Sequence, residues 1–365
     1  MMIRANLLEL SAQEVVNRLN ASPSSMACID VRSEGEFAEG HIPGFQNVPI
    51  LNNEERHLVG LTYKEKGQTA AIALGHELVS GVIRSKRIEK WKELIGDRHG
   101  VIACWRGGLR SKLASEWLRE QGLPCMTVTG GYKALRKVLI DEVLRTRPMF
   151  VLSGFTGSGK TKLLKALNSP MLDIEGMAVH RGSCFGASIS KTQPSQQSFE
   201  NEMGLKLSGF KKSFVVEDES SRLGRLIIPP PFKEQIKKAP VVLLEASLRD
   251  RAHHIFSEYI TEALENKITY LEIANFFLQN LKYIEKRLGG LRYKEIFDLI
   301  RSSFTLPPTF DNHQLWIEAL LTEHYDPAYQ FAFDRLERPV AFRGNFNECR
   351  EWLDLNLNSE VVRAE

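Results

Sequence analysis

A cysteine followed by a loop rich in glycine and arginine is the first candidate for chemistry in this sequence. Residues 104–111 read CWRGGLRS, after the apolar run VIAC and before the helix-forming stretch LASEWLREQG. The backbone N–H groups of such a loop converge on one point in front of a helix N-terminus, and the arginines add positive charge. Both features stabilise a thiolate at Cys104, which could carry sulfur or selenium or attack phosphorus. We predict that the loop binds an anion through Arg106, Gly107, Gly108 and Arg110.

A second candidate is a glycine-rich phosphate loop. The segment GFTGSGKT (154–161) matches the pattern G-x-x-x-x-G-K-[ST] in full, and it lies between the apolar run MFVLSG and the helical run KLLKALN. In this context the glycines let backbone N–H groups approach phosphate oxygens, while Lys160 reaches the outer phosphates and Thr161 binds Mg²⁺. The predicted phosphate-binding residues are Gly154, Gly157, Ser158, Gly159, Lys160 and Thr161.

Acidic residues after a further strand could hold the magnesium ion. The apolar run SFVVED predicts a central strand whose carboxyl end carries VVEDE (215–219). Glu217 or Asp218 could therefore hold Mg²⁺ through water, as acidic residues do beside other phosphate loops. The alternative is that one or two of the residues Glu217, Asp218 and Glu219 belong to a solvated acidic turn.

The segment EGMAVHRGSCFG (175–186) predicts a substrate loop near the phosphate site. It follows the apparent strand MLDI, so His180 and Arg181 could contact a substrate phosphate or an RNA base. An equally good alternative from the sequence is a structural turn in which Arg181 forms a salt bridge. Arg249 and Arg251, after the run PVVLLEA, are similar to the charge-neutralising arginines of nucleotide kinases, with helix-surface charge as the alternative.

The strands and helices that must position these residues can be predicted from the sequence, and their pattern indicates an α/β protein. Apolar runs alternate with helical patterns, and runs that end in small or acidic residues suit parallel sheets with function at their carboxyl ends. Ser33 and Glu36 form a capping box that opens a helix, Pro148 marks a linker, and one or two helices are expected between Tyr63 and Leu94. The first domain should contain strands at 27–31, 101–104 and 126–128, and the second at 149–154, 213–218, 240–246 and 339–342.

Composition narrows the class of protein. The chain has 365 residues, of which 43% are hydrophobic and 25% are charged, which are ordinary globular values. No run of eighteen apolar residues predicts a membrane span, and the N-terminus does not resemble a secretion signal. Five scattered cysteines without a CxxC pair argue against a disulfide scaffold or a structural zinc site and favour the cytoplasm. With a net charge of +3, any nucleic-acid surface must be a local patch.

The first part of the chain resembles a rhodanese domain. DVRSEGEFAEGHIPGFQNVPI (30–50), Cys104 and GGY (130–132) carry this resemblance, which implies a sulfurtransferase-like fold with Cys104 as the acceptor of a chalcogen atom. The spacing Cys-x5-Arg is one residue longer than in common sulfurtransferases and also occurs in rhodanese-like phosphatases. Those phosphatases usually have histidine before the cysteine, where this chain has Ala103. A phosphatase is therefore the second interpretation.

In order along nearly the whole chain, several phrases resemble the bacterial tRNA 2-selenouridine synthase family. They are CWRGGLRS, GGYKALR, SGFTGSGKT, DIEGMAVHRGSCFG, VEDESSRLG and HYDPAY. The resemblance implies a transferase that alkylates the sulfur of 2-thiouridine at the tRNA wobble position with geranyl diphosphate. Selenium from selenophosphate then replaces the S-geranyl group through a perselenide on Cys104. It also implies tRNA as the partner substrate and selenophosphate synthetase as a further partner. Mg²⁺ is the expected cofactor, and no tightly bound organic cofactor is expected.

Four regions follow from the pattern and the resemblance. They are a rhodanese-like domain at 1–147, a P-loop domain at 148–251, a helical region for tRNA recognition at 252–332, and a return strand with a closing helix at 333–365. Expected tRNA contacts are Arg84, Lys86, Arg87, Lys90, Lys282, Lys286, Arg287, Arg292 and Lys294, with ordinary surface ion pairs as the alternative. Two other functions stay open: a Cys-x5-Arg phosphatase fused to a P-loop kinase, and a non-catalytic tRNA-binding chalcogen carrier.

Overall fold

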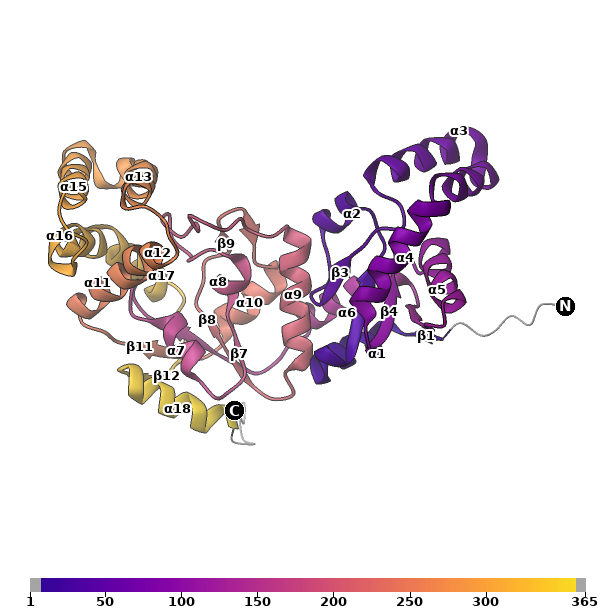
Figure 1. Cartoon of the computed structure of the whole chain (residues 1–365). Coiled ribbons are helices and arrows are strands. Elements are labelled where there is room, and N and C mark those ends of the chain that lie inside the picture. The colour runs from indigo at the N-terminus through magenta and orange to yellow at the C-terminus, as the bar shows by residue number, and fades with distance from the viewer. Residues whose placement is uncertain (1–7, 359–365) are drawn as a thin grey trace. The chain divides into compact units, whose positions relative to one another are not determined.

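The computed structural model describes residues 8–358 and contains two compact units, whose elements are labelled in Figure 1. The thiol-loop unit comprises the chain up to Arg145 together with Ser195–Gly209. The phosphate-loop unit comprises Thr146–Pro194 and the chain from Phe210. The sequence pattern assigned residues 148–251 to the second domain as one stretch, whereas Ser195–Gly209 belongs to the first unit because its helix packs on helices of that unit.

The thiol-loop unit is built on a parallel sheet of five strands in the order β1-β5-β4-β2-β3. The predicted strands at 27–31, 101–104 and 126–128 are confirmed, each within one or two residues. Because β4 is the middle strand, the loop that follows it opens at the centre of the carboxyl edge. The strands are β1 (Glu9–Leu10), β2 (Met26–Asp30), β3 (Phe45–Asn47), β4 (His99–Ala103) and β5 (Met126–Val128).

Alternate residues of β2 and β4 point to opposite faces of this sheet and build two cores. Cys28 and Val101 pack with α1, α6 and neighbouring residues, whereas Ile29 and Ile102 pack with α4 and α5. The fully buried faces explain why these strands are continuous apolar runs. The helices are α1 (Ala12–Ala21), α2 (Glu34–Glu39), α3 (Asn53–Leu78), α4 (Gly81–Ile95), α5 (Leu109–Glu120), α6 (Gly131–Leu144) and α9 (Gln196–Gly209).

Local capping sets where two of these helices begin. The predicted capping box of Ser33 and Glu36 is present at the start of α2. A second capping box, formed by Asn52 and Glu55, starts α3 ten residues before the expected helical stretch. Within α3, Gly67 has a φ of 81°, which kinks the helix, because only glycine adopts this region readily.

The phosphate-loop unit has its own parallel sheet, in the order β12-β11-β6-β8-β7. Its four predicted strands are confirmed, and Asn345 accepts hydrogen bonds from the N–H groups of Asn347 and Glu348 to start α18. The strands are β6 (Met149–Ser153), β7 (Met171–Leu172), β8 (Phe214–Glu217), β11 (Val241–Leu244) and β12 (Val340–Gly344), with a hairpin of β9 (Arg222–Leu223) and β10 (Leu226–Ile227). Its helices are α7 (Lys160–Ala166), α8 (Ile174–Ala178), α10 (Pro230–Lys238) and α18 (Phe346–Asn358).

A helical region between β11 and β12 has a core of its own. Phe277 and Trp316 lie at its centre, with ring centroids 4.8 Å apart, and Phe185 joins them from the loop after α8. None of the described helices is both long and apolar enough to cross a membrane. The helices are α11 (Leu248–Phe256), η2 (Ser257–Thr261), α12 (Glu262–Glu265), α13 (Tyr270–Leu281), η3 (Lys282–Ile284), α14 (Glu285–Leu288), α15 (Gly290–Ser303), α16 (Phe310–Leu320), η4 (Leu321–Tyr325) and α17 (Asp326–Asp334).

Candidate active site

Cys104 lies directly after β4 and is buried, with 3% of its surface exposed. Its Sγ is 3.2 Å from Oγ of Ser111 and 4.0 Å from the carbonyl oxygen of Gly108. Ser111 is fully buried on the first turn of α5, and its hydroxyl donates a hydrogen bond to the carbonyl oxygen of Gly108 at 3.1 Å. The same hydroxyl can rotate to donate to a thiolate at Cys104. Ser111 was not among the predicted site residues, although its position at the start of the helix behind the loop pointed to it.

The GGY segment (130–132) packs against the backbone of the thiol loop. Gly131 has a φ of 57°, and a Cβ there would lie 2.2 Å from the carbonyl oxygen of Cys104 and 2.5 Å from the nitrogen of Gly107. The N–H of Tyr132 donates to the same carbonyl at 2.8 Å. Glycine is therefore required at 131, because any side chain would push the loop out of place.

The arginines of the thiol loop differ in their partners. Arg106 is exposed, whereas Arg110 donates hydrogen bonds of 2.6 and 3.1 Å to the carboxylate of Glu36. Burial disfavours both charged forms, but the ion pair outweighs it, which lowers the pKa of Glu36 and raises the pKa of Arg110. The predicted anion-binding cation is thus held in place by a carboxylate.

The remaining polar residues of the 30–50 segment have structural roles. Asp30 and Arg32 form a buried ion pair of 2.7 Å, and the guanidinium of Arg32 lies 3.8 Å from the ring centroid of Tyr132. Arg32 also donates to the carbonyl of Gly40, while the amide of Asn47 donates to the carbonyls of Asp30 and Arg32. This network fixes the turn that follows β2, so the motif is explained by folding as well as by chemistry.

The phosphate loop has the backbone that phosphate binding requires. Gly157 and Gly159 have φ values of 79° and 90°, and a side chain on Gly157 would meet the carbonyl oxygen of Arg251 at 2.7 Å. The ammonium of Lys160 donates to the carbonyl of Gly154 at 3.1 Å, across the mouth of the loop. Ser158 lies within the loop and is buried.

A fully buried carboxylate and a half-buried one face Thr161. Its Oγ1 is 2.7 Å from Oε1 of Glu217 and 3.0 Å from Oε2 of Glu175. Burial, and then the negative charge of Glu175, raise the pKa of Glu217 to about 8. Glu175 was not among the predicted site residues, although it directly follows the strand end MLDI and begins the segment EGMAVHRGSCFG.

Asp218 points to a different partner from Glu217. It accepts hydrogen bonds from Arg338 and from the hydroxyl of Ser153, and these bonds lower its pKa despite its burial. Among the described residues, no group of three or more His, Cys, Asp and Glu side chains is arranged as a metal cage. A magnesium ion at this loop would therefore need phosphate oxygens and water, with Thr161 and Glu217 as the nearest protein oxygens.

The two predicted residues of the substrate loop have different positions relative to the phosphate loop. Arg181 lines the cavity at the phosphate loop, where its guanidinium pairs with Glu262 at 3.2 Å and lies 4.6 Å from the ring centroid of Tyr259. His180 lines a neighbouring cavity, and burial lowers its pKa. Arg181 thus forms the salt bridge that the sequence allowed and also reaches the site.

Arg251 and the HYDPAY segment (324–329) form hydrogen bonds and a salt bridge that fix the phosphate loop and the end of β6. The guanidinium of Arg251 donates to the carbonyl of Thr156 at 2.9 Å and forms a salt bridge with Asp326. The hydroxyl of Tyr329 lies 2.9 Å from that of Ser153, at the end of β6. Arg251 therefore positions the loop through its backbone, while Arg249 does not line the cavity.

The cavity at the phosphate loop has a volume of about 340 Å³ and a mixed lining of cationic, acidic and aromatic side chains. The cations are Lys160, Arg181, Lys233 and Arg338, and the acids are Glu175, Asp218, Glu219 and Glu258. The aromatic residues are Tyr259, Tyr325, Tyr329 and Phe333. Such a cavity can bind an anionic group and an apolar group of one ligand side by side.

Family models match both units. Residues 11–137 match the rhodanese-like domain, and residues 147–360 match the tRNA 2-selenouridine synthase AAA domain. Three proteins named tRNA 2-selenouridine synthase are similar over most of their length. The chain is 38% identical to the one from Marinobacter nauticus (92% of this chain, 95% of the relative). It is 39% identical to the one from Shewanella sediminis and 40% identical to the one from a Sulfurovum species (89% of this chain and 93% of the relative in both cases).

A phosphate-loop domain of this kind joined to a rhodanese-like domain, together with relatives that align from end to end, shows the family. The chain belongs to the tRNA 2-selenouridine synthases.

Proposed function

We propose that this synthase works in two steps on the wobble uridine of tRNA. In the first step, the sulfur of 2-thiouridine attacks the C1 carbon of geranyl diphosphate, and diphosphate leaves. In the second step, selenium derived from selenophosphate replaces the S-geranyl group at C2. The order makes chemical sense, because a thiocarbonyl sulfur leaves poorly, whereas an S-alkyl thiolate leaves readily.

The observation that carries the proposal is the pairing of cations and aromatic rings in the phosphate-loop cavity. Lys160 and the loop N–H groups suit a diphosphate, whose negative charge grows as it leaves. Tyr259, Tyr325 and Tyr329 suit the adjoining allylic chain, since aromatic faces attract the positive charge that develops at its C1 carbon.

The oxygen donors around Thr161 fit a magnesium ion. Its hydroxyl and the carboxylate of Glu217 are hard ligands that would hold the ion, with water and diphosphate oxygens completing its coordination. Bound Mg²⁺ would neutralise part of the diphosphate charge. Asp218 is excluded from this proposed site because Arg338 and Ser153 occupy its carboxylate.

The thiol loop supports the second step. Selenium carried on Sγ of Cys104 as a perselenide would attack C2, and geranylthiolate would leave. To form the perselenide, the thiolate of Cys104 would attack the selenium of selenophosphate, and the Se–P bond would break with its electron pair left on phosphorus, which departs as phosphite. After selenium has bonded to C2, an added thiol would cleave the S–Se bond, forming a disulfide with Cys104 and leaving both electrons on the selenium of the base. The hydroxyl of Ser111 and the ion-paired Arg110 are placed to stabilise negative charge on the carried atom.

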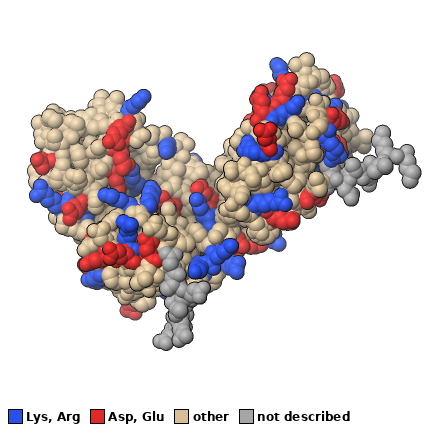
Figure 2. Space-filling view, turned by 60° about the horizontal axis from the view of Figure 1, so that its bottom comes forward, with Lys and Arg blue, Asp and Glu red and all other residues tan. Residues whose placement is uncertain are grey.

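We further propose that tRNA binds through local basic patches on a cytoplasmic enzyme. On the face shown in Figure 2, Lys and Arg lie among Asp and Glu instead of forming one broad basic field. Lys282, Lys286 and Arg287 are exposed, whereas Arg84 pairs with Glu120 and Arg87 pairs with Glu55. The exposed lysines of the helical region are therefore the better candidates for phosphate contacts.

The test is reconstitution with purified chain and an anticodon stem-loop RNA that contains 2-thiouridine. Geranyl diphosphate and Mg²⁺ should add one geranyl group to the RNA, and selenophosphate with a thiol should then give 2-selenouridine, both seen by mass spectrometry. An RNA of unchanged mass would overturn the proposal. Phosphate release from simple esters that depends on Cys104 would support the phosphatase–kinase instead, and tight RNA binding without any mass change would support a carrier.

A further inference from the structure

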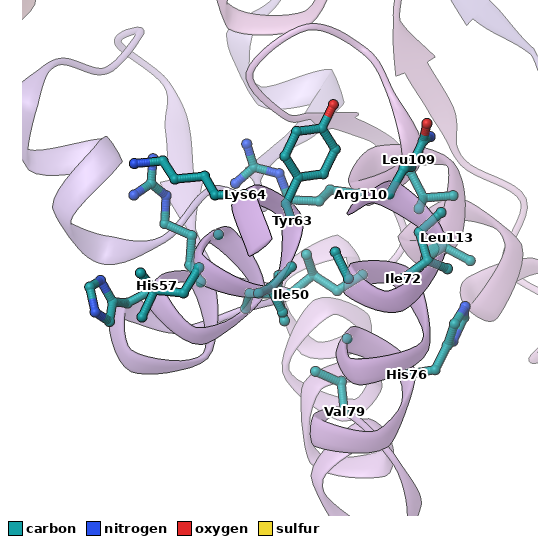
Figure 3. A pocket seen from close by; sticks show the side chains of 18 of the residues that line it. Ile50, His57, Tyr63, Lys64, Ile72, His76, Val79, Leu109, Arg110 and Leu113 are labelled. Carbon is teal, nitrogen blue, oxygen red and sulfur yellow. The ribbon is translucent and has the colours of Figure 1, made fainter. Parts of the chain in front are cut away.

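The thiol-loop unit contains a large apolar pocket to which no role has been given so far. Its volume is about 610 Å³, within the range of about 300–1,000 Å³ that is usual for small-ligand sites. The lining comes from α3, α5 and the chain around Ile50. The floor is aliphatic and includes Ile50, Val59, Ala71, Ile72, Val79 and Leu113, several of which are labelled in Figure 3.

The rim of this pocket is cationic. The rim residues with basic side chains are Arg56, His57, Lys64 and Arg110. Figure 3 shows Lys64, Tyr63 and Arg110 along the upper side of the pocket, Ile50 and Ile72 below them, and Val79 at the lower end. Tyr63 and Leu109 are about half exposed although they belong to an apolar wall. Such exposure is explained when a ligand covers these side chains.

The pocket is continuous with the thiol loop. Leu109 lines it and directly follows Gly108, whose carbonyl oxygen lies 4.0 Å from Sγ of Cys104. Arg110, the next residue, belongs to both the pocket and the thiol loop, and Leu113 lies one helical turn further along α5. A group attached to a base at Cys104 could therefore extend over Leu109 into the apolar floor.

We propose that this pocket receives the ten-carbon geranyl chain of S-geranyl-2-thiouridine in RNA during the selenium step. The inference rests on the proposed function, because it assumes that the S-geranyl base is the intermediate. The aliphatic floor matches the hydrocarbon chain. On the rim, Arg56 and Arg110 pair with Glu36, whereas Lys64 has no salt bridge to a described side chain and matches a phosphate of the RNA that carries the chain. The pocket thereby lets the enzyme discriminate between the S-geranyl base and 2-thiouridine, because 2-thiouridine has no hydrocarbon chain to bury.

A variant that fills the pocket provides the test. Gly75 lies on α3 and lines the pocket, and the nearest atom to a Cβ built there is Cγ2 of Val59, at 3.9 Å. A Cβ at this position therefore meets no clash, the rest of a leucine side chain would occupy space in the pocket, and leucine favours a helix more than glycine does. Gly290→Leu is the matched control, because Gly290 begins α15 in the other unit and no atom lies within 4 Å of its Cβ position.

Affinity is measured without selenophosphate for three stem-loop RNAs that carry 2-thiouridine, S-methyl-2-thiouridine or S-geranyl-2-thiouridine. We expect the unaltered enzyme and Gly290→Leu to bind the S-geranyl RNA at least about tenfold tighter than the S-methyl RNA, because each buried methylene can contribute roughly fourfold. Gly75→Leu should lose this preference, keep its affinity for the 2-thiouridine RNA, and melt at or above the temperature of the unaltered enzyme.

Equal binding of the S-methyl and S-geranyl RNAs by the unaltered enzyme would overturn the inference. So would a Gly75→Leu variant that keeps the full preference, which would place the chain elsewhere. Both results are distinct from failure of the proposed function, which would show as no geranyl addition to 2-thiouridine RNA or no later selenium insertion by the unaltered enzyme. Binding of S-geranyl RNA is measured with synthetic RNA and needs no such turnover.

Discussion

The guanidinium of Arg110 donates two hydrogen bonds to the carboxylate of Glu36, at 2.6 and 3.1 Å. Glu36 also closes the capping box of α2, so the start of that helix and the closing cation of the thiol loop share one carboxylate. The pair gives Arg110 a fixed direction before any anion arrives. Fixed cations stabilise a developing charge better than mobile ones, because they need not reorganise during the reaction.

Glu36→Gln should therefore slow the selenium step by roughly 10- to 100-fold and leave geranyl transfer unchanged, because small misplacements of a catalytic group have effects of this size. Single-turnover selenation of S-geranyl RNA measures the first rate, and geranyl transfer to 2-thiouridine RNA measures the second. Glu39→Gln, on the exposed side of the same helix, should behave like the unaltered enzyme. A normal selenation rate in Glu36→Gln would remove Glu36 from this positioning role.

The same carboxylate predicts a pH dependence of stability. The pKa of Glu36 is lowered in the folded state, so its ion pairs add stability that is fully present above about pH 4.5. This stability is lost as the pH falls through the lowered pKa. Denaturant unfolding between pH 3 and pH 6 should thus show a shallower acid decline for Glu36→Gln than for the unaltered enzyme, and parallel curves would contradict the assignment.

Cys104→Ala should abolish selenium insertion and spare geranyl transfer, because only the second step needs a chalcogen carrier. S-geranyl-2-thiouridine should then accumulate when all substrates are supplied, as nucleoside mass spectrometry would show. Cys125→Ala is the matched control: this cysteine is equally buried in the same unit, and burial raises its pKa to about 11, so it is a poor thiolate. Selenation at the normal rate in Cys104→Ala would exclude the carrier role.

Lys160→Ala should block geranyl transfer first. Its ammonium lies across the mouth of the phosphate loop, and loss of one donor that stabilises developing charge typically costs on the order of 10²–10³ in rate. Lys162→Ala removes an exposed lysine two residues away and should have little effect. If Lys160→Ala transferred geranyl normally and failed only in selenation, the phosphate loop would serve the second step or a nucleotide.

Glu217→Gln should weaken the binding of the Mg²⁺ ion on which geranyl transfer depends. Its carboxylate lies 2.7 Å from Oγ1 of Thr161, and an amide is a poorer ligand for this ion than a carboxylate. The Mg²⁺ concentration that gives half-maximal transfer should rise by about tenfold or more in this variant. Glu234→Gln, on the solvent side of α10, is the control. An unchanged Mg²⁺ titration would leave Glu175 as the carboxylate to test.

The sequence predicted the parts of these sites that are local in the chain. Cys104 and Lys160 lie in continuous motifs, and the apolar runs around them form strands because both faces of each sheet are buried. The pairing of Arg338 with Asp218 could not be predicted, because 120 residues separate the two and only the folded sheet brings them together. The helix at Ser195–Gly209 was missed as part of the first unit for the same reason: its contacts with α6 are tertiary.

The helical region supplies the last prediction, which concerns tRNA. Lys282 and Lys286 are exposed at η3 and α14, and no ion pair between described side chains includes either of them. Arg292, nearby in α15, is instead engaged by Glu295 and Glu323. Free lysines can release counterions when they meet phosphates, whereas a paired arginine must first give up its carboxylates.

The Lys282→Ala/Lys286→Ala double variant should bind tRNA more weakly than the unaltered enzyme. Its plot of log affinity against log salt concentration should be flatter by about one to two units, since each phosphate contact contributes roughly 0.7–0.9 to the slope. Arg292→Ala is the matched control and should change neither affinity nor slope appreciably, because its charge is already compensated. An unchanged slope in the double variant would move the tRNA surface away from this region, and a change only in Arg292→Ala would invert the assignment.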